Sequence, residues 1–260
     1  MIVTPKKFLG QHFLKDLNIA QNIADSLNVN GPTNVLEIGP GMGVLTQFLL
    51  KNPSINLQVV ELDRESVVYL NENFPALKGR ILAEDFLKLD LGKLFDGEPF
   101  YVIGNYPYNI SSQIFFKVLE YRDRVPVCSG MIQKEVAERM ASKPNCKAYG
   151  ILSVLLQAFY DIEYLFTVHE YVFDPPPKVK SAVIRMVRND VKKLDCDESL
   201  FIKVVKTSFN QRRKMLRNSI AQLVAKESPL LKDPIMTKRP EQLSVQDFIE
   251  LTNKVQQEII

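Results

Sequence analysis

The sequence predicts an α/β fold with a mostly parallel sheet, followed by a small all-helical domain. Over the first two-thirds of the chain, short β-branched runs alternate with amphipathic stretches, which is the pattern of βαβ units. These runs are apolar on both faces, as strands are when helices cover both sides of a sheet. From Leu200 onward the periodicity becomes helical, with breaks near Pro229, Pro234 and Pro240.

Seven runs have the composition of strands, and amphipathic stretches separate most of them. The expected strands are Asn34–Gly39, Leu57–Leu62, Arg80–Ala83, Phe100–Gly104, Val125–Ile132, Ile162–Thr167 and Ser181–Val187. The expected helices before the C-terminal domain are Leu17–Leu27, Val44–Lys51, Glu65–Asn73, Ser112–Tyr121 and Ile151–Tyr160. Three consecutive prolines at 175–177 predict a stiff loop, since proline excludes helix and central strand.

A polar stretch, Asn189–Glu198, has the character of a linker and divides the chain into domains 1–188 and 189–260. Charge follows a similar division. Residues 1–185 hold 19 Lys and Arg against 20 Asp and Glu, whereas residues 186–260 hold 14 against 10. The excess positive charge therefore lies in the C-terminal part and indicates an anionic partner there.

Composition excludes several classes of protein. The chain has 260 residues, of which 46% are hydrophobic, enough for a sizeable core. No apolar run approaches the roughly 18 to 20 residues of a membrane span, and Met1–Phe13 lacks the apolar stretch of a signal peptide. We therefore expect a cytoplasmic protein. Cys128, Cys146 and Cys196 are not paired at metal-ligand spacing, so we expect free thiols and no metal.

A glycine-rich turn follows the first expected strand, with Gly39, Gly41 and Gly43 at alternate positions. Glycine lets a backbone turn tightly and approach a ligand closely, and the next helix start offers free N–H groups. At this edge of a parallel sheet the natural ligand is a nucleotide-type cofactor. A dinucleotide fingerprint would need glycine at position 44, which is Val44, so the spacing argues against NAD.

Carboxylates stand at the ends of the next two expected strands. Glu61 can accept hydrogen bonds from both hydroxyls of a ribose, and Asp85 can accept one from an adenine amino group. Their neighbours Leu62 and Phe86 are expected to line the same site. Together with the glycine turn, these strand ends offer one suitable group for each part of an adenosyl ligand.

The fourth expected strand ends in Asn105-Tyr106-Pro107-Tyr108. An exocyclic amine on a purine is a poor nucleophile because its lone pair is delocalised into the ring. The Asn105 side-chain oxygen and the Tyr106 carbonyl, held by the rigid Pro107, can each accept one N–H of such an amine. They would then aim the lone pair at a methyl sulfonium. Tyr108 offers a flat face for a flipped-out base.

The residues resemble the KsgA family of small-subunit ribosomal RNA adenine dimethyltransferases. The matching strings lie in the family's order and cover nearly the whole chain: Lys7–Leu14, Glu37–Thr46, Glu61–Asp63, Asn105–Ser111 and Phe173–Ser181. The resemblance implies a Rossmann-like class I methyltransferase fold with a seven-stranded sheet and S-adenosylmethionine as cofactor. It also implies the reaction, dimethylation of N6 on two adjacent adenosines in the 3′-terminal hairpin loop of 16S rRNA during ribosome biogenesis, within the immature 30S subunit.

The resemblance also assigns residues. His12 and Leu14 would line the cofactor pocket, Gly39 would approach the methionine moiety, Glu61 the ribose, Asp85 the adenine, and Asn105 the methyl group and target amine. Tyr108 and Phe173 are similar to the aromatic pair that sandwiches the target base. Family members often carry Asn at the position of His12, and Leu or Ile at that of Tyr106. Both changes leave backbone contacts available, and only the role of the His12 side chain carries less weight.

A basic stretch lies in the C-terminal domain. No acidic residue occurs between Leu200 and Ala225, where basic residues alternate with apolar ones. A helix with an apolar stripe and an unopposed basic face suits RNA phosphates. The expected RNA-binding residues are Lys203, Lys206, Arg212, Arg213, Lys214 and Arg217.

Three alternatives remain open. Enzymes of the erythromycin-resistance type share the fold but methylate large-subunit rRNA, and the Gly39-Pro40-Gly41 loop and Pro175–Lys178 favour the small-subunit group over them. Enzymes that methylate DNA adenine usually carry an acidic or Asn-Pro-Pro-Tyr type of element, whereas Tyr106 replaces the first proline here. A non-catalytic assembly factor could keep the fold, but the intact Asn105–Tyr108 element argues for catalysis. We take a monomer as the default oligomeric state.

Overall fold

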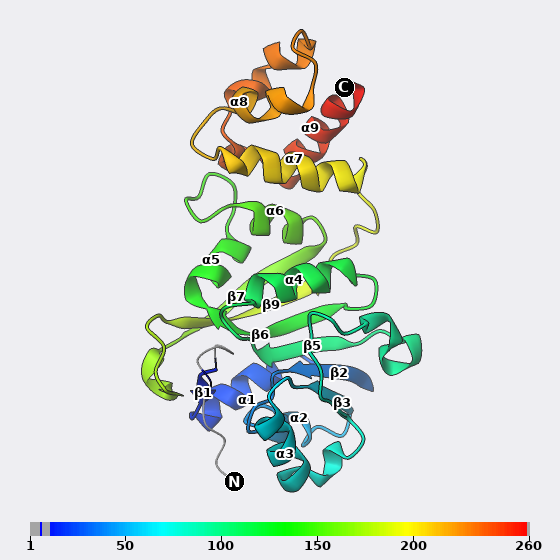
Figure 1. Cartoon of the computed structure of the whole chain (residues 1–260), viewed down its shortest axis with the longest axis vertical. Helices are drawn as coiled ribbons and strands as arrows, with labels where there is room; N and C mark the ends of the chain where they lie inside the picture. The colour runs from blue at the N-terminus through cyan, green and yellow to red at the C-terminus, as the bar shows by residue number, and fades with distance from the viewer. Residues whose placement is uncertain (1–5, 7–10, 259–260) are drawn as a thin grey trace. The chain divides into compact units, whose positions relative to one another are not determined.

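The computed structural model describes residue 6 and residues 11–258, and its contacts group the chain into two compact units (Figure 1). The sheet unit comprises residues 1–137 and 161–188, and the helical unit comprises residues 138–160 and 189–260. The chain thus returns to the helical unit at 188/189, where the sequence places a domain boundary. Residues 138–160, expected in the first domain, group with the helical unit instead. The functional division into 1–188 and 189–260 stays a prediction.

The sheet unit is built on one seven-stranded sheet. In spatial order its strands are β4 (Ile81–Leu82), β3 (Ile55–Val60), β2 (Thr33–Ile38), β5 (Tyr101–Asn105), β6 (Val127–Gln133), β9 (Ser181–Arg188) and β7 (Tyr160–Val168). The five strands from β4 to β6 pair in parallel, and β9 runs antiparallel to β6. The mostly parallel sheet of seven strands is therefore confirmed.

The strand order reverses between β2 and β5. The chain proceeds outward from β2 to β3 and β4, then crosses back to place β5 on the other side of β2. The register pairs Ile38 with Gly104, so the carboxyl ends of β2 and β5 lie side by side. In open α/β sheets ligands bind outside the strand ends at such a reversal.

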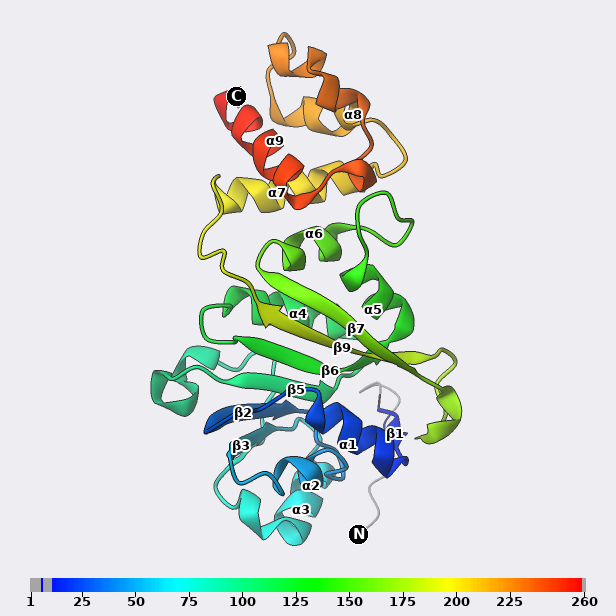
Figure 2. The ribbon, with the colours of Figure 1, turned by 180° about the vertical axis from the view of Figure 1, so that it is seen from behind.

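Helices cover both faces of this sheet. Figure 1 shows α4 (Ser111–Glu120) in front of the strands, and the view from behind in Figure 2 shows α1 (Leu17–Asp25) in front of them. Helix α1 begins at Asp16, whose side chain accepts the backbone N–H groups of Asn18 and Ile19. Fully buried apolar side chains of the strands, including those of Val35, Leu57, Ile103, Met131 and Val183, form the core beneath the helices.

Helix α2, strand β4 and helix α5 differ from the sequence prediction. Helix α2 covers only Thr46–Leu49 instead of Val44–Lys51, because Gly43 adopts a left-handed conformation and Pro53 follows closely. Strand β4 has only two residues. Helix α5 (Lys134–Ala141) was not predicted, because it follows β6 without any intervening turn signal. Helix α3 (Arg64–Asn73) lies close to its expected range.

A second, two-stranded sheet joins the beginning of the described chain to the proline loop. Strand β1 (Phe13–Leu14) pairs antiparallel with β8 (Phe173–Asp174). The Lys15 N–H also donates to the Val172 carbonyl over 2.8 Å. In both ribbon views the yellow-green connection after β7 accordingly lies beside β1. Residues far apart in sequence therefore border the same edge of the large sheet.

The helical unit consists of α6 (Ile151–Gln157), α7 (Glu198–Asn210), α8 (Leu216–Ile220) and α9 (Val245–Gln257), with α7 packed against the other three. The expected breaks are confirmed, because short 3₁₀ turns begin at Pro229, Pro234 and Pro240. Among the helices formed by the described residues of the whole chain, none combines the length and apolar character needed to cross a lipid bilayer.

Candidate active site

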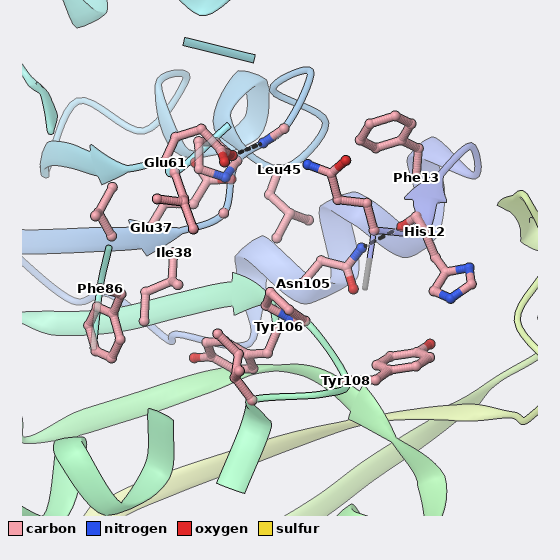
Figure 3. Close-up of a pocket in the computed structure, with 18 of the residues that line it drawn as sticks. His12, Phe13, Glu37, Ile38, Leu45, Glu61, Phe86, Asn105, Tyr106 and Tyr108 are labelled. Carbon is pink, nitrogen blue, oxygen red and sulfur yellow. Dashed lines mark hydrogen bonds between the residues drawn. The ribbon is translucent and has the colours of Figure 1, made fainter. Parts of the chain in front are cut away.

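A cavity of about 330 Å³ opens at the carboxyl ends of β2, β3, β4 and β5, a volume within the range of small-molecule sites. Figure 3 shows side chains from β1 and from these four strand ends facing it. Every residue predicted to bind the cofactor lines this cavity: His12, Leu14, Gly39, Gly41, Glu61, Leu62, Asp85, Phe86 and Asn105. Residues 7–10 of the first family string lie outside the described residues.

The glycine turn forms the wall of the cavity after β2. Gly39 has φ +64°, a left-handed conformation that favours glycine. A Cβ built on Gly39 would meet no atom within 4 Å, so the backbone there is open to a ligand. A Cβ on Gly43, in contrast, would collide with the Phe74 ring. The first glycine therefore leaves room for a ligand, whereas the third allows the turn to pack against the end of α3.

Glu61 connects the glycine turn to the end of β3. One carboxylate oxygen accepts the Gly41 N–H at 3.0 Å, and the other accepts the Asp63 N–H at 2.8 Å. Burial raises the pKa of Glu61, while these backbone hydrogen bonds oppose the rise. Each oxygen of a carboxylate keeps a second lone pair. The side chain can therefore hold the turn and still accept the hydroxyls of a ribose.

Glu37 is a buried carboxyl group of the cavity that sequence reasoning did not assign to the site. Its side chain is 1% exposed and accepts a hydrogen bond of 2.7 Å from the Thr46 hydroxyl. Burial raises the pKa of Glu37 to about 8, and the charge of Glu61 adds to the rise. The group thus keeps its proton at neutral pH. The sequence signal that could have identified Glu37 is its position as an acidic residue at an otherwise apolar strand end, just before the glycine turn.

The loop after β4 supplies another wall. Asp85 accepts the Leu87 N–H at 2.9 Å, and Phe86 is buried beside it. Lys117 of α4 holds this loop, because its ammonium donates to the carbonyls of Leu87 and Leu89 and lies 5.4 Å from the centre of the Phe86 ring. Lys117 is only 9% exposed, and burial lowers its pKa. Nothing in the sequence distinguishes this lysine from a surface one.

Asn105 projects into the cavity from the end of β5 (Figure 3). Its side-chain nitrogen donates to the His12 carbonyl over 3.1 Å. This bond fixes the orientation of the amide and leaves its oxygen available to accept an amine. Pro107 also lines the cavity, directly after Tyr106, and fixes the course of the chain at this strand end.

The Tyr106 side chain lies in the core, although its backbone borders the cavity. The ring is 1% exposed, and its hydroxyl donates to the Ser129 carbonyl over 2.6 Å. A Cβ on Gly104 would lie 3.0 Å from this ring, and one on Gly130 would lie 2.6 Å from it. The ring therefore occupies space that two glycines leave free. This anchors the backbone whose carbonyl was predicted to accept an N–H.

The structure separates the two predicted base-stacking residues. Tyr108 lines the cavity, where its ring stacks on His12 with centroids 5.3 Å apart and planes at 28° (Figure 3). Its hydroxyl is bonded to the Ser181 hydroxyl. Phe173 is 1% exposed and belongs to the hydrophobic core, because the pairing of β8 with β1 places it opposite Leu14. In this conformation it does not reach the cavity.

The predicted RNA-binding residues lie in the helical unit but do not share one helix. Lys203 and Lys206 are exposed on α7, which ends at Asn210. Arg213 and Lys214 are exposed on the following turn, and Arg217 is exposed on α8. Arg212 is half-buried, and its guanidinium donates to the carbonyls of Cys146 and Lys147. Arg212 holds the 138–160 segment, so its charge is less available to RNA than the charges of the other five residues.

A parallel sheet with a reversal at β2, a glycine turn and acidic strand ends defines the fold and the cofactor cavity of a class I methyltransferase. The family model described as ribosomal RNA adenine dimethylase matches residues 3–257. The chain belongs to this family.

Curated relatives agree with this assignment. The chain is 71% identical over 251 residues to ribosomal RNA small subunit methyltransferase A of Parabacteroides distasonis, covering 96% of this chain and 94% of that protein. It is 67% identical over 256 residues to the protein of the same name from Phocaeicola vulgatus, covering 98% and 91%.

Solved structures share the fold at low identity. A dimethyladenosine transferase from Plasmodium falciparum superimposes with a TM-score of 0.77 at 22% identity, covering 96% of this chain and all of that one. The 23S rRNA methyltransferase ErmE superimposes with a TM-score of 0.68 at 24% identity, covering 93% and 99%. A dimethyladenosine transferase and a 23S rRNA methyltransferase thus share this architecture, so fold alone does not identify the substrate.

Proposed function

We propose that the protein is an S-adenosylmethionine-dependent methyltransferase that dimethylates N6 of two adjacent adenosines in the 3′-terminal hairpin loop of 16S rRNA. The family supports the reaction, and identities of 67% and 71% to small-subunit enzymes favour this rRNA over that of the large subunit. The substrate is the immature 30S subunit during ribosome biogenesis. The enzyme acts as a monomer in the cytoplasm.

The cavity residues fit the cofactor. The open backbone at Gly39 leaves room for the methionine part, the Glu61 carboxylate accepts the ribose hydroxyls, and Asp85 accepts the adenine amino group. Phe86 would pack against the adenine, and Leu14 and His12, which also line the cavity, would help to enclose the cofactor. When bound, S-adenosylmethionine supplies an electrophilic methyl group on its sulfonium.

The observation that carries the proposal is the position of Asn105 and Tyr106 at the end of β5, facing the same cavity as the glycine turn and Glu61. The Asn105 oxygen and the Tyr106 carbonyl accept the two N–H groups of the target amine. This orients the nitrogen lone pair toward the methyl carbon without a metal or a histidine base. The methylated nitrogen would carry a positive charge, which it would lose by releasing one of its two N–H protons to water. Tyr108 stacks on the flipped base once the His12 ring has moved away from the face of Tyr108.

Methyl transfer to immature 30S subunits tests the proposal, with mapping of the modified adenosines by mass spectrometry. The wild type should convert two adjacent adenosines of 16S rRNA to their dimethylated form, and Asn105→Ala should lower kcat by about 100-fold or more, the order found when an oriented polar group is removed from a reacting centre. Retained subunit binding by Asn105→Ala would separate catalysis from assembly. Transfer to 50S precursors or duplex DNA instead, or an inactive wild type, would refute the proposal.

A further inference from the structure

An exposed aromatic pair stands on the connection between β7 and β8. Tyr171 is 71% exposed, more than any other large hydrophobic side chain among the described residues. Its ring stacks on that of His169, with centroids 5.5 Å apart and planes at 18°. The ring is therefore held in one orientation, with its other face toward solvent. A flat, exposed and preordered ring of this kind suits the face of a nucleobase.

The backbone beneath this pair is fixed. The two rings flank the start of the 3₁₀ turn Glu170–Val172, which begins directly after His169. Val172 is buried, and its carbonyl accepts the Lys15 N–H at 2.8 Å. The next residue, Phe173, is buried opposite Leu14 in the β1–β8 pair. Tyr171 is thus an exposed residue on an anchored turn, which lowers the entropy lost when a ligand stacks on it.

The pair also lies near the candidate active site. Tyr171 precedes Phe173 by two residues, and Phe173 pairs with Leu14, which lines the cavity. On the other side of β8, the Pro175 carbonyl lies 2.8 Å from the His12 ring nitrogen. His12 in turn stacks on Tyr108. The same two-stranded element therefore borders the cavity and carries the exposed rings.

The charges of this segment point to the mode of binding. Residues 169–180 contain two lysines, Lys178 and Lys180, and two acids, Glu170 and Asp174. The formal charges of the lysines and acids cancel, so attraction to phosphates would be weak. Stacking on an aromatic ring is tolerant of base identity and neutralises no phosphate, whereas phosphate contacts make binding depend strongly on salt.

We propose that Tyr171, backed by His169, is a stacking platform for an unpaired base of the RNA substrate, next to the adenosine that enters the cavity. This rests on the proposed function, because it assigns a second recognition point for the same RNA. The platform holds the single-stranded loop at the rim through its ring and makes no sequence-specific contact.

Variants of Tyr171 test the platform. Tyr171→Ala should raise the KM for immature 30S subunits by on the order of 10-fold, the effect of losing one stacked base. It should leave kcat at saturating subunits and the affinity for S-adenosylmethionine, measured by calorimetry, unchanged. Tyr171→Phe keeps the ring and should behave as the wild type. Tyr164→Ala removes another tyrosine of the same unit and serves as a matched control.

Three results would overturn the platform: an unchanged KM for Tyr171→Ala, an equal rise in KM for Tyr171→Phe, or a rise for Tyr171→Ala no greater than that for Tyr164→Ala.

The ratio of KM values between Tyr171→Ala and wild type should also stay constant between ~50 and ~200 mM salt, and a ratio that shrinks would indicate charge rather than stacking. Binding of a fluorescent single-stranded oligoadenylate provides a readout without methyl transfer. If the wild type binds this probe more tightly than Tyr171→Ala but methylates no subunits, the proposed function fails while the platform stands. If the wild type methylates subunits but Tyr171→Ala binds the probe as tightly as the wild type, only the platform fails.

Discussion

Replacing Glu37 with glutamine should stabilise the protein at alkaline pH. The carboxyl group is 1% exposed, and its Oε2 accepts the Thr46 hydroxyl. Burial raises its pKa from an ordinary value of 4.5 to about 8. Glutamine is close in shape, carries no charge at any pH, and offers the same hydroxyl a carbonyl oxygen.

The sign and size follow from linkage. Between pH 4.5 and about 8 the unfolded chain releases the Glu37 proton while the folded chain keeps it. The contribution of this group to the free energy of unfolding is therefore complete below pH 4.5 and falls as pH rises, at about 1.36 kcal/mol per pH unit. Over the whole interval the loss is roughly 5 kcal/mol. Glu37→Gln lacks this loss.

Urea denaturation at several pH values measures the effect. The difference in free energy of unfolding between Glu37→Gln and wild type should be small near pH 5 and reach several kcal/mol in favour of the variant by pH 8, with equal m values. Glu72→Gln, at an exposed position of α3, controls for loss of one negative charge and should shift stability by no more than about 0.5 kcal/mol. A difference that does not change with pH would refute the assignment of a proton to the buried carboxyl group.

Two further predictions concern ligands. Lys117→Met removes the ammonium that donates to the Leu87 and Leu89 carbonyls. It should weaken S-adenosylmethionine binding by about tenfold, the value of one charged hydrogen bond, and leave kcat at saturating cofactor near that of the wild type. Equal affinities of variant and wild type in calorimetry would contradict this prediction. Lys203 and Lys206 are exposed on α7, and changing both to Gln should reduce the dependence of log K for subunit binding on log salt concentration. The slope should fall by about one for each phosphate that is no longer neutralised. Lys78→Gln, at an exposed position of the sheet unit, should leave the slope unchanged.

The sequence was sufficient to predict the seven strands of the large sheet, most of the helices and the cofactor edge, because period, glycine spacing and strand-end acids are local signals. It did not predict α5 or the short strands β1 and β8. Gly39, Glu61 and Asn105 are found where those signals place them. Helix α2 is shorter than its periodicity suggests because backbone conformation at Gly43 overrides propensity. The basic stretch is divided between α7, a turn and α8, since apolar periodicity continues across a break that tertiary packing imposes.

Other features depend on contacts between distant segments and leave no local trace. Lys117 is buried only because the loop after β4 folds over it. Phe173 has the motif of a base-stacking residue, yet the pairing of β8 with β1 buries it. The proton held by Glu37 likewise follows from the packing around β2 rather than from the residue type.

Gly104 and Gly130 lack side chains at places where both the Tyr106 ring and a backbone carbonyl approach closely. A Cβ at 104 would lie 2.6 Å from the Ile38 carbonyl oxygen, and one at 130 would lie closer still to the Gly104 carbonyl oxygen. A methyl group at 130 would collide with the phenol and with the Gly104 carbonyl. A smaller aliphatic residue at 106 would remove only the ring's part of this constraint, because the carbonyl contacts at Gly104 on β5 and at Gly130 on β6 would remain. Glycine is therefore expected to be retained at 104 and 130 throughout the family, whichever residue occupies position 106.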